Sequence, residues 1–238
     1  MLYILSFIIG LISFKVFHSL INDNVIENYI DKLISNATFK EIPELIKGKT
    51  GYAKNVDVKI FYEDLCLCEN PISTVILING SSESLIQWPD KMVRNILKND
   101  FRIIRFDNRG VGMSDWIPNW SNSNSYNLND MALDTLAVTN HLNLDKFHLI
   151  GCSMGGMISQ ILAINYPDKI LSLTTLMSSG HLFDPEAEKP NSKQFRQLRK
   201  MRYGYRNNKR ELKKALKFHF KLSHIWVGSG NYVHNQEK

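Results

Sequence analysis

One serine stands in a pattern that can make a hydroxyl group nucleophilic. Ser153 lies in the segment 151–156 (GCSMGG), with Gly151 two residues before it and Gly155 two residues after it. An apolar run precedes this segment and a helical pattern follows it, which is the context of a nucleophile elbow, a sharp turn between a strand and a helix. We expect the turn to project the hydroxyl from the sheet, because the two glycines avoid Cβ clashes. The alternative is an ordinary strand-to-helix turn.

Acyl-transfer chemistry also needs two backbone N–H groups that point at the oxyanion forming in the transition state. The amide of Met154, directly after the serine, is one candidate, and the following helix would direct its positive dipole end at the same place. The second candidate is the amide of Ser81, because Gly80, at the end of the apolar run 73–78, lets the backbone approach a substrate. The alternative for residues 79–81 is an ordinary turn.

The elements that must position these groups alternate along the chain. Continuous apolar runs predict buried strands, helical patterns separate them, and an alternating segment at 56–62 predicts a half-buried strand. The predicted buried strands are 73–78, 101–106, 147–150 and 170–176, and the predicted helices are 88–98, 128–142 and 154–166. This order predicts an α/β fold with a mostly parallel sheet and helices on both faces. Sites in such sheets lie at the carboxyl ends of the strands, where both glycine motifs fall.

Three blocks of sequence, in their order along the chain, resemble the α/β-hydrolase superfamily, particularly its esterase-like and methylesterase-like members. The blocks are VILINGSSES at 75–84, FRIIRFDNRGVGMSDW at 101–116, and the segment 126–170 around Ser153. The resemblance implies an α/β-hydrolase core over residues 51–180. It also implies a serine hydrolase that acts on a carboxylic ester or a related small acyl substrate, with no cofactor and no metal ion.

Two details of these blocks bear on the site. The second block fits the family's D-x-R-G-x-G-x-S loop through Asp107 and Arg109, and in the family this loop supports the strand ends without reacting. Many members have His-Gly where this chain has Asn79 and Gly80. The resemblance therefore implies an oxyanion loop whose first residue departs from the family pattern.

The resemblance further implies a catalytic acid and then a histidine after the nucleophile, since serine needs a base and the base needs an orienting carboxylate. The run 170–176 resembles the family's sixth strand, whereas residues 181–238 read mainly as basic, cap-like helices. Asp184 is an alternative position for the acid, and His234 is a base only if the chain folds back unusually. We therefore expect the final strands and the complete triad to be missing from this sequence, and the sheet to expose an unpaired edge.

Both ends of the sequence carry features outside this core. Residues 1–21 form an apolar segment that predicts a membrane anchor, with a cleaved signal peptide or a docking helix as alternatives. Residues 22–50 read as an amphipathic helix and a connector. The net charge of +6 is concentrated in residues 193–221, where Glu211 is the only acidic residue among many Lys and Arg residues. This block predicts a solvated helical face or contact with an anionic membrane surface, and nucleic acid is not an expected partner.

Two functions from different classes remain open at this point. The first is a serine hydrolase that is catalytically incomplete in this sequence. The second is a non-catalytic α/β-hydrolase-like binding protein at a membrane surface. The apolar segment favours a membrane-anchored location, with a secreted, periplasmic or cytoplasmic location as the alternatives.

Overall fold

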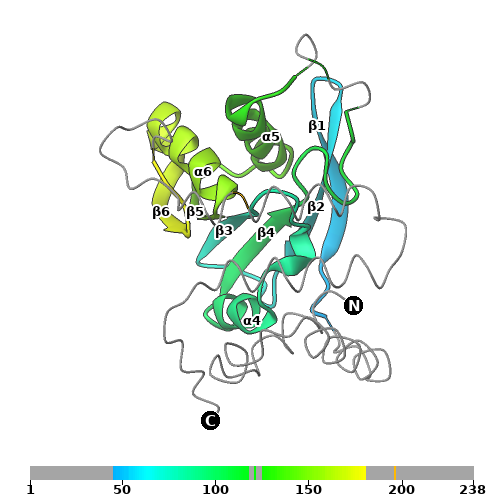
Figure 1. Cartoon of the computed structure of the whole chain (residues 1–238). Coiled ribbons are helices and arrows are strands. Elements are labelled where there is room, and N and C mark those ends of the chain that lie inside the picture. The colour runs from blue at the N-terminus through cyan, green and yellow to red at the C-terminus, as the bar shows by residue number, and fades with distance from the viewer. Residues whose placement is uncertain (1–44, 118–120, 122–124, 181–195, 197–238) are drawn as a thin grey trace, which may run out of the picture. The chain divides into compact units, whose positions relative to one another are not determined.

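A computed structural model of the protein describes residues 45–117, 121, 125–180 and 196. The elements described below belong to one unit of the chain, Glu44–Pro185 (Figure 1). The strands are β1 (Lys49–Asn55), β2 (Val58–Leu65), β3 (Ser73–Ile78), β4 (Phe101–Phe106), β5 (Phe147–Cys152) and β6 (Ile170–Leu176). The helices are α4 (Asp90–Lys98), α5 (Leu128–His141) and α6 (Met154–Asn165), with the short 3-10 helices η1 (Leu85–Gln87) and η2 (Pro167–Lys169).

The six strands form one sheet in the order β1-β2-β4-β3-β5-β6. The pairs β1–β2 and β2–β4 are antiparallel, and the other three pairs are parallel. Figure 1 shows α4 on one side of the sheet and α5 and α6 on the other. The predicted fold, a mostly parallel sheet with helices on both faces, is confirmed. The carboxyl ends of β3, β4 and β5 meet at one edge of this sheet because the three strands run in the same direction.

The central strand β3 is a continuous apolar run because both of its faces are buried. Ile76 and Ile78 belong to the hydrophobic core that the sheet shares with α5 and α6. Val75 and Leu77 belong to the core on the other face, which the sheet shares with α4. Successive side chains of a strand point to opposite faces, so a strand covered on both sides needs an apolar residue at each position. Each such side chain contributes roughly 1.5–3 kcal/mol when it is fully buried.

The amino-terminal side of the sheet differs from the sequence prediction. The predicted strand at 56–62 corresponds to β2, but its predicted start is two residues too early: β1 and β2 form a hairpin in which Asn55 pairs with Val58, and residues 56 and 57 are its turn. Val56 has a φ of 52°, in the left-handed region, and is 81% exposed. A β-branched residue is rare in that conformation, so the sequence around Val56 indicates a strand where the chain in fact reverses. The polar strand β1 begins at Lys49, so the last two residues of the expected connector belong to the sheet.

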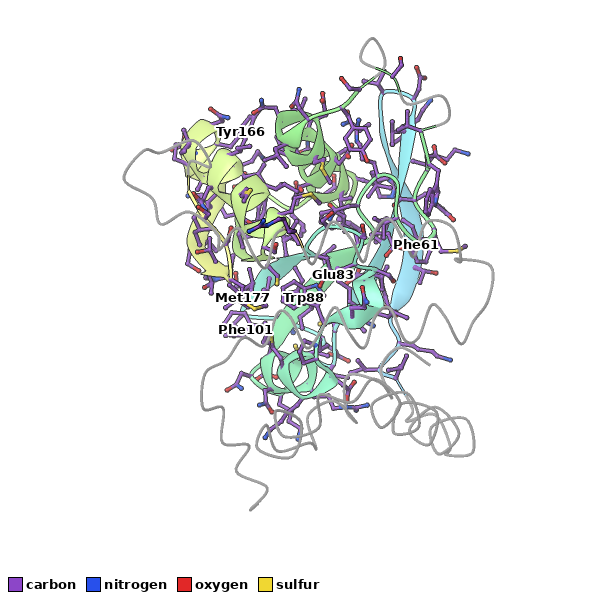
Figure 2. The ribbon with its side chains drawn as sticks, viewed as in Figure 1. Phe61, Glu83, Trp88, Phe101, Tyr166 and Met177 are labelled. Carbon is purple, nitrogen blue, oxygen red and sulfur yellow. The ribbon has the colours of Figure 1, made fainter. Side chains whose placement is uncertain are left out.

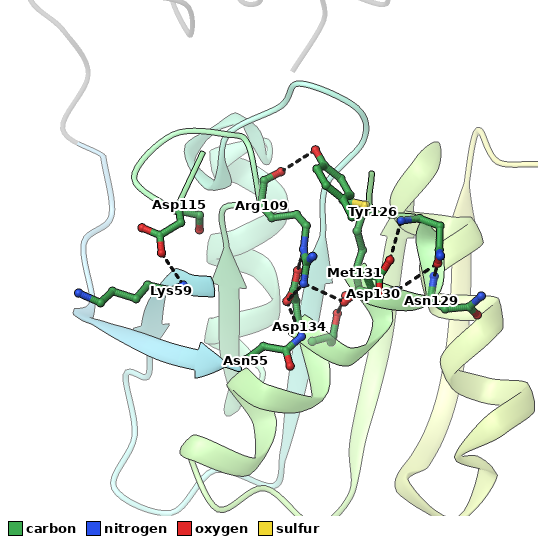
Figure 3. A network of polar contacts seen from close by, with 12 residues as sticks. Asn55, Lys59, Arg109, Asp115, Tyr126, Asn129, Asp130, Met131 and Asp134 are labelled. Carbon is green, nitrogen blue, oxygen red and sulfur yellow. Dashed lines mark hydrogen bonds and ion pairs between the residues drawn. The ribbon is translucent and has the colours of Figure 1, made fainter. Parts of the chain in front are cut away.

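A buried ion pair ties the loop after β4 to α5 (Figure 3). The Arg109 guanidinium donates two hydrogen bonds of 2.6 Å to the carboxylate of Asp134, one to each oxygen. Asn55, at the end of β1, donates a third hydrogen bond to Asp134, and the ring of Tyr126 lies 5.3 Å from the guanidinium carbon. The hydrogen bonds to Asp134 raise the pKa of Arg109. The pair thus joins the hairpin, the loop after β4 and α5 at one point.

At the other side of the sheet, β6 pairs with β5 alone within the described part of the chain. Its residues after Ile170 are exposed, including Leu171, Leu173 and Leu176. Met177, which follows the strand, is 87% exposed (Figure 2). Apolar side chains along a one-sided strand are a surface that another polypeptide segment could cover.

Several predictions from the sequence fall on residues that the structure does not describe. These are the apolar segment 1–21, most of the segment 22–50, and, apart from Arg196, the basic block 193–221 and the cap-like segment 181–238. Within the described ranges, no helix is long and apolar enough to span a membrane. Membrane contact through 1–21 and 193–221 therefore stays a prediction.

We expect Arg109→Met to lower the free energy of unfolding by about 3–5 kcal/mol, because it leaves the buried Asp134 carboxylate without its partner. Lys54→Met is the matched control, since Lys54 pairs with Asp57 at 3.9 Å with both side chains largely exposed. That change should cost about 0–1 kcal/mol. Urea-induced unfolding at neutral pH measures both values, and equal shifts in the two variants would contradict a structural role for the buried pair.

Candidate active site

Ser153 occupies a sharp turn between β5 and α6. Its φ of 51° and ψ of −117° lie outside the regions that non-glycine residues normally adopt, and such a conformation stores about 1–3 kcal/mol. Contacts from the end of β6 hold it there: the Ser153 amide donates to the carbonyl of Leu176 at 2.8 Å, and the hydroxyl of Ser178 donates to the Ser153 carbonyl at 2.8 Å. Among the described residues, no side chain hydrogen-bonds to the Ser153 hydroxyl.

The first turn of α6 lies in backbone contact with the end of β3. A Cβ atom at Gly155 would come within 2.0 Å of the carbonyl oxygen of Ile78, so no larger residue fits there without a shift of the backbone. Gly151 is equally enclosed, because a Cβ atom on it would lie 2.3 Å from the carbonyl oxygen of Gly155. The two glycines that flank Ser153 in the sequence therefore contact each other across the turn.

The loop after β3 reaches the same place. A Cβ atom at Gly80 would lie 3.3 Å from the Cβ atom of Ser153, so the two glycine-bearing motifs meet at one edge of the sheet. Within the described residues, the amides of Ser81 and Met154 have no hydrogen-bond acceptor. For Met154 an unsatisfied N–H donor is expected, because it lies in the first turn of α6, where no helical carbonyl precedes it. Both amides are therefore available to a ligand.

Asn79, the residue that departs from the family pattern, anchors this loop. It is 2% exposed, and its side-chain amide donates to the carbonyl of Ser84. Its own carbonyl oxygen accepts a hydrogen bond of 3.1 Å from the side chain of Asn108. The loops after β3 and β4 are thereby joined beneath the edge where Gly80 and Ser153 meet.

Asp107 also joins the loops after β3 and β4. One carboxylate oxygen accepts from the amide of Leu85 at 2.7 Å, and the other accepts from the amide of Met113 at 2.8 Å. Gly112 has a φ of 52°, and a Cβ atom there would lie 2.0 Å from the Asp107 carboxylate. The hydroxyl of Ser114 donates to the Asp107 carbonyl. Both oxygens of Asp107 are thus occupied by backbone donors, and Arg109 is held by Asp134.

The sequence did not single out Glu83, which lies at this edge. Its carboxylate accepts a hydrogen bond of 3.0 Å from the amide of Gly80. Burial raises the pKa of the Cys152 thiol, and the charge of Glu83 raises it further, so the carboxylate lies close enough to act on the residue before Ser153. The only signal in the sequence is its place three residues after Gly80 in a turn at a strand end.

The two histidines in the described part of the chain, His141 and His148, make their contacts away from Ser153. The ring of His141 lies against Tyr62, with centroids 5.6 Å apart. His148, near the start of β5, lies 2.8 Å from the hydroxyl of Ser172, at the amino-terminal end of the strand that leads to Ser153. Asp184 and His234 lie outside the described residues. In the described ranges, no cluster of three His, Cys, Asp or Glu residues could hold a metal ion.

Comparison with known proteins gives a consistent result. A protein-family model described as alpha/beta hydrolase fold matches residues 73–231. The chain is 30% identical over 114 residues to rhodomycin D methylesterase from Streptomyces peucetius, a match that covers 48% of this chain and 38% of that protein. It is 34% identical over 125 residues to a 2-hydroxy-6-oxononadienedioate/2-hydroxy-6-oxononatrienedioate hydrolase from Escherichia coli, covering 52% of this chain and 41% of that protein.

A solved structure agrees on the fold. The crystal structure of a putative lipase from Acinetobacter baumannii superposes with a TM-score of 0.53 at 23% identity, covering 64% of this chain and 48% of the lipase. The chain spans less than half the length of the two curated relatives named above.

We expect Gly155→Ala to destabilise the protein by at least about 1–3 kcal/mol, because the added methyl group would overlap the backbone at the end of β3. Gly180→Ala is the matched control, since the nearest atom of the described residues to a Cβ there is 3.9 Å away, and this change should stay within about 0.5 kcal/mol. Thermal unfolding followed by circular dichroism distinguishes the two. A Gly155→Ala protein as stable as the Gly180→Ala protein would show that α6 does not need this close approach.

Proposed function

Because the chain belongs to the α/β-hydrolase family, we propose that it is a serine hydrolase of carboxylic esters or related small acyl substrates, with Ser153 as its nucleophile. The observation that carries this proposal is the strained conformation of Ser153 at the start of α6, directly beside Gly80. A non-glycine residue is held in such a conformation only when the surrounding structure enforces it, and strain of this kind is concentrated at functional sites.

The proposed chemistry follows from the groups at this edge. The Ser153 oxygen attacks the carbonyl carbon of the substrate, its proton passes to a base, and the carbonyl oxygen becomes an oxyanion. The amides of Ser81 and Met154, which have no other acceptor among the described residues, donate hydrogen bonds to that oxyanion. Collapse of the tetrahedral intermediate expels the alcohol, which takes the proton from the base, and leaves an acyl-serine ester. Water then releases the acid by the same steps.

The proposed chemistry also needs a base and an acid that orients the base. By the family's chain order both follow the nucleophile, and His234 and Asp184 are the positions that the sequence offers. A carboxylate nucleophile is disfavoured, because the elbow position holds a serine. The relatives that share the fold carry names of esterases and other hydrolases, which supports ester or related acyl chemistry here.

The proposal predicts that a fluorophosphonate probe labels Ser153, because such probes react with serine hydroxyl groups that are activated for acyl transfer. Such labelling would also overturn the expectation that the triad is incomplete, since it would show that a base reaches this serine. The Ser153→Ala variant should lose the label, whereas Ser172→Ala, which changes an exposed serine on β6, should keep it. Mass spectrometry of the tryptic peptides identifies the labelled residue. A well-folded protein without any label would instead favour the non-catalytic binding protein.

A further inference from the structure

Glu83 is an acidic side chain that lies close to the proposed nucleophile. A Cβ atom at Gly80 would lie 2.7 Å from one carboxylate oxygen of Glu83 and 3.3 Å from the Cβ atom of Ser153. The two side chains therefore flank the same point on the loop after β3, where the proposed reaction takes place. Figure 2 labels Glu83 together with Trp88, which follows it in the same loop.

This carboxylate has no counter-ion in the described part of the chain. Its one hydrogen bond there comes from the backbone amide of Gly80, and none of the ion pairs among the described residues includes it. Other acidic groups of this unit are balanced differently. Glu63 and Asp64 on β2 and Asp134 on α5 each pair with an arginine. Asp107, after β4, has no cation, but backbone amides donate to both of its carboxylate oxygens. Glu83 therefore places a half-buried carboxylate beside the proposed reaction centre with no cation and one hydrogen bond among the described residues.

Such a group acts on the reaction through its charge. The transition state for acyl transfer places negative charge on the substrate oxygen, and a nearby carboxylate repels that charge. The repulsion is removed when the substrate itself brings a cation that lies between the two. The same carboxylate also attracts a cationic substrate to the site before reaction.

We propose that Glu83 makes this site selective for acyl substrates that carry a cationic group, such as an ammonium, close to the reacting carbonyl. The inference rests on the proposed function, because it needs Ser153 to react with the substrate. It adds the charge of the preferred substrate, which neither the fold nor the glycine motifs specify.

Glu83 also has a second role that the test must separate from its charge. Its hydrogen bond to the Gly80 amide closes the turn 80–83, in which Ser82 has a φ of 65° and the Glu83 amide donates to the Gly80 carbonyl. That turn carries the Ser81 amide. Glu83→Gln keeps a side-chain oxygen of the same length that can accept the Gly80 hydrogen bond, and it removes only the charge.

The experiment uses two organophosphonate probes that differ in one group, a trimethylammonium in one and a tert-butyl in the other. The two groups have nearly the same size and shape, so the ratio of the labelling rates at Ser153 reports charge preference. We expect the unchanged protein to react roughly tenfold faster with the cationic probe, because opposite charges attract at a partly solvated site. In Glu83→Gln the ratio should fall to about one, and the tert-butyl probe should react at least as fast as before.

Two controls accompany this comparison. Glu69→Gln makes the same change in net charge at an exposed glutamate in the loop after β2 and should leave the ratio intact. In the unchanged protein, raising the ionic strength from about 0.01 to 1 M should lower the ratio, because salt screens partly exposed charges.

Each outcome decides between the possibilities. A ratio near one in the unchanged protein, or a ratio that Glu83→Gln does not alter, overturns the selectivity. A Glu83→Gln protein that labels more slowly with both probes by the same factor shows that Glu83 only closes the turn, which also overturns it. If neither probe labels Ser153 while the protein is folded, the proposed function fails instead.

Discussion

Backbone contact between the first turn of α6 and the end of β3 is the constraint on which the rest of the site depends. The Gly155 Cα lies so close to the Ile78 carbonyl that a methyl group cannot be added. This approach brings the turn at Ser153 up against the loop that begins at Gly80. Without it, the serine, the two unsatisfied amides and the Glu83 carboxylate would belong to separate loops. Glycine at this position is thus required by packing, and the proposed chemistry depends on that packing.

The buried polar groups near this contact have a different role from the polar groups at the edge of the sheet. Asp107 and Asp134 are almost fully buried, and each oxygen of their carboxylates has a donor. A buried carboxylate in this state holds loops at fixed positions, because leaving it without donors would be costly. The groups at the surface of the edge have unused capacity: the Ser153 hydroxyl and the Ser81 and Met154 amides lack partners among the described residues. The buried carboxylates thus form a rigid support, and the groups at the edge of the sheet are available to a ligand.

Much of this arrangement could be predicted from the sequence, for reasons that individual elements make clear. The strands at 73–78, 101–106 and 170–176 have the predicted bounds. Of these, β3 is the easiest to recognise, because it is buried on both faces and its side chains are apolar from Val75 to Ile78. The strand β1 could not be recognised, because of its seven residues only Ala53 is buried and its pattern is polar. Glu83 escaped notice for another reason. Its importance comes from the approach of two loops far apart in the sequence, and no local pattern encodes that distance.

The backbone of Ser153 is held by Leu176 and Ser178, which end β6 and follow it. Within the described chain this strand has a neighbour on one side only. If β6 opened locally, Ser153 would lose the two hydrogen bonds that hold it at its unfavourable torsion angles. The residue could then relax to an ordinary backbone conformation. The orientation of the Ser153 hydroxyl therefore depends on whether β6 stays paired at the edge of the sheet. A ligand that binds along β6 would stabilise the conformation of Ser153 without touching it.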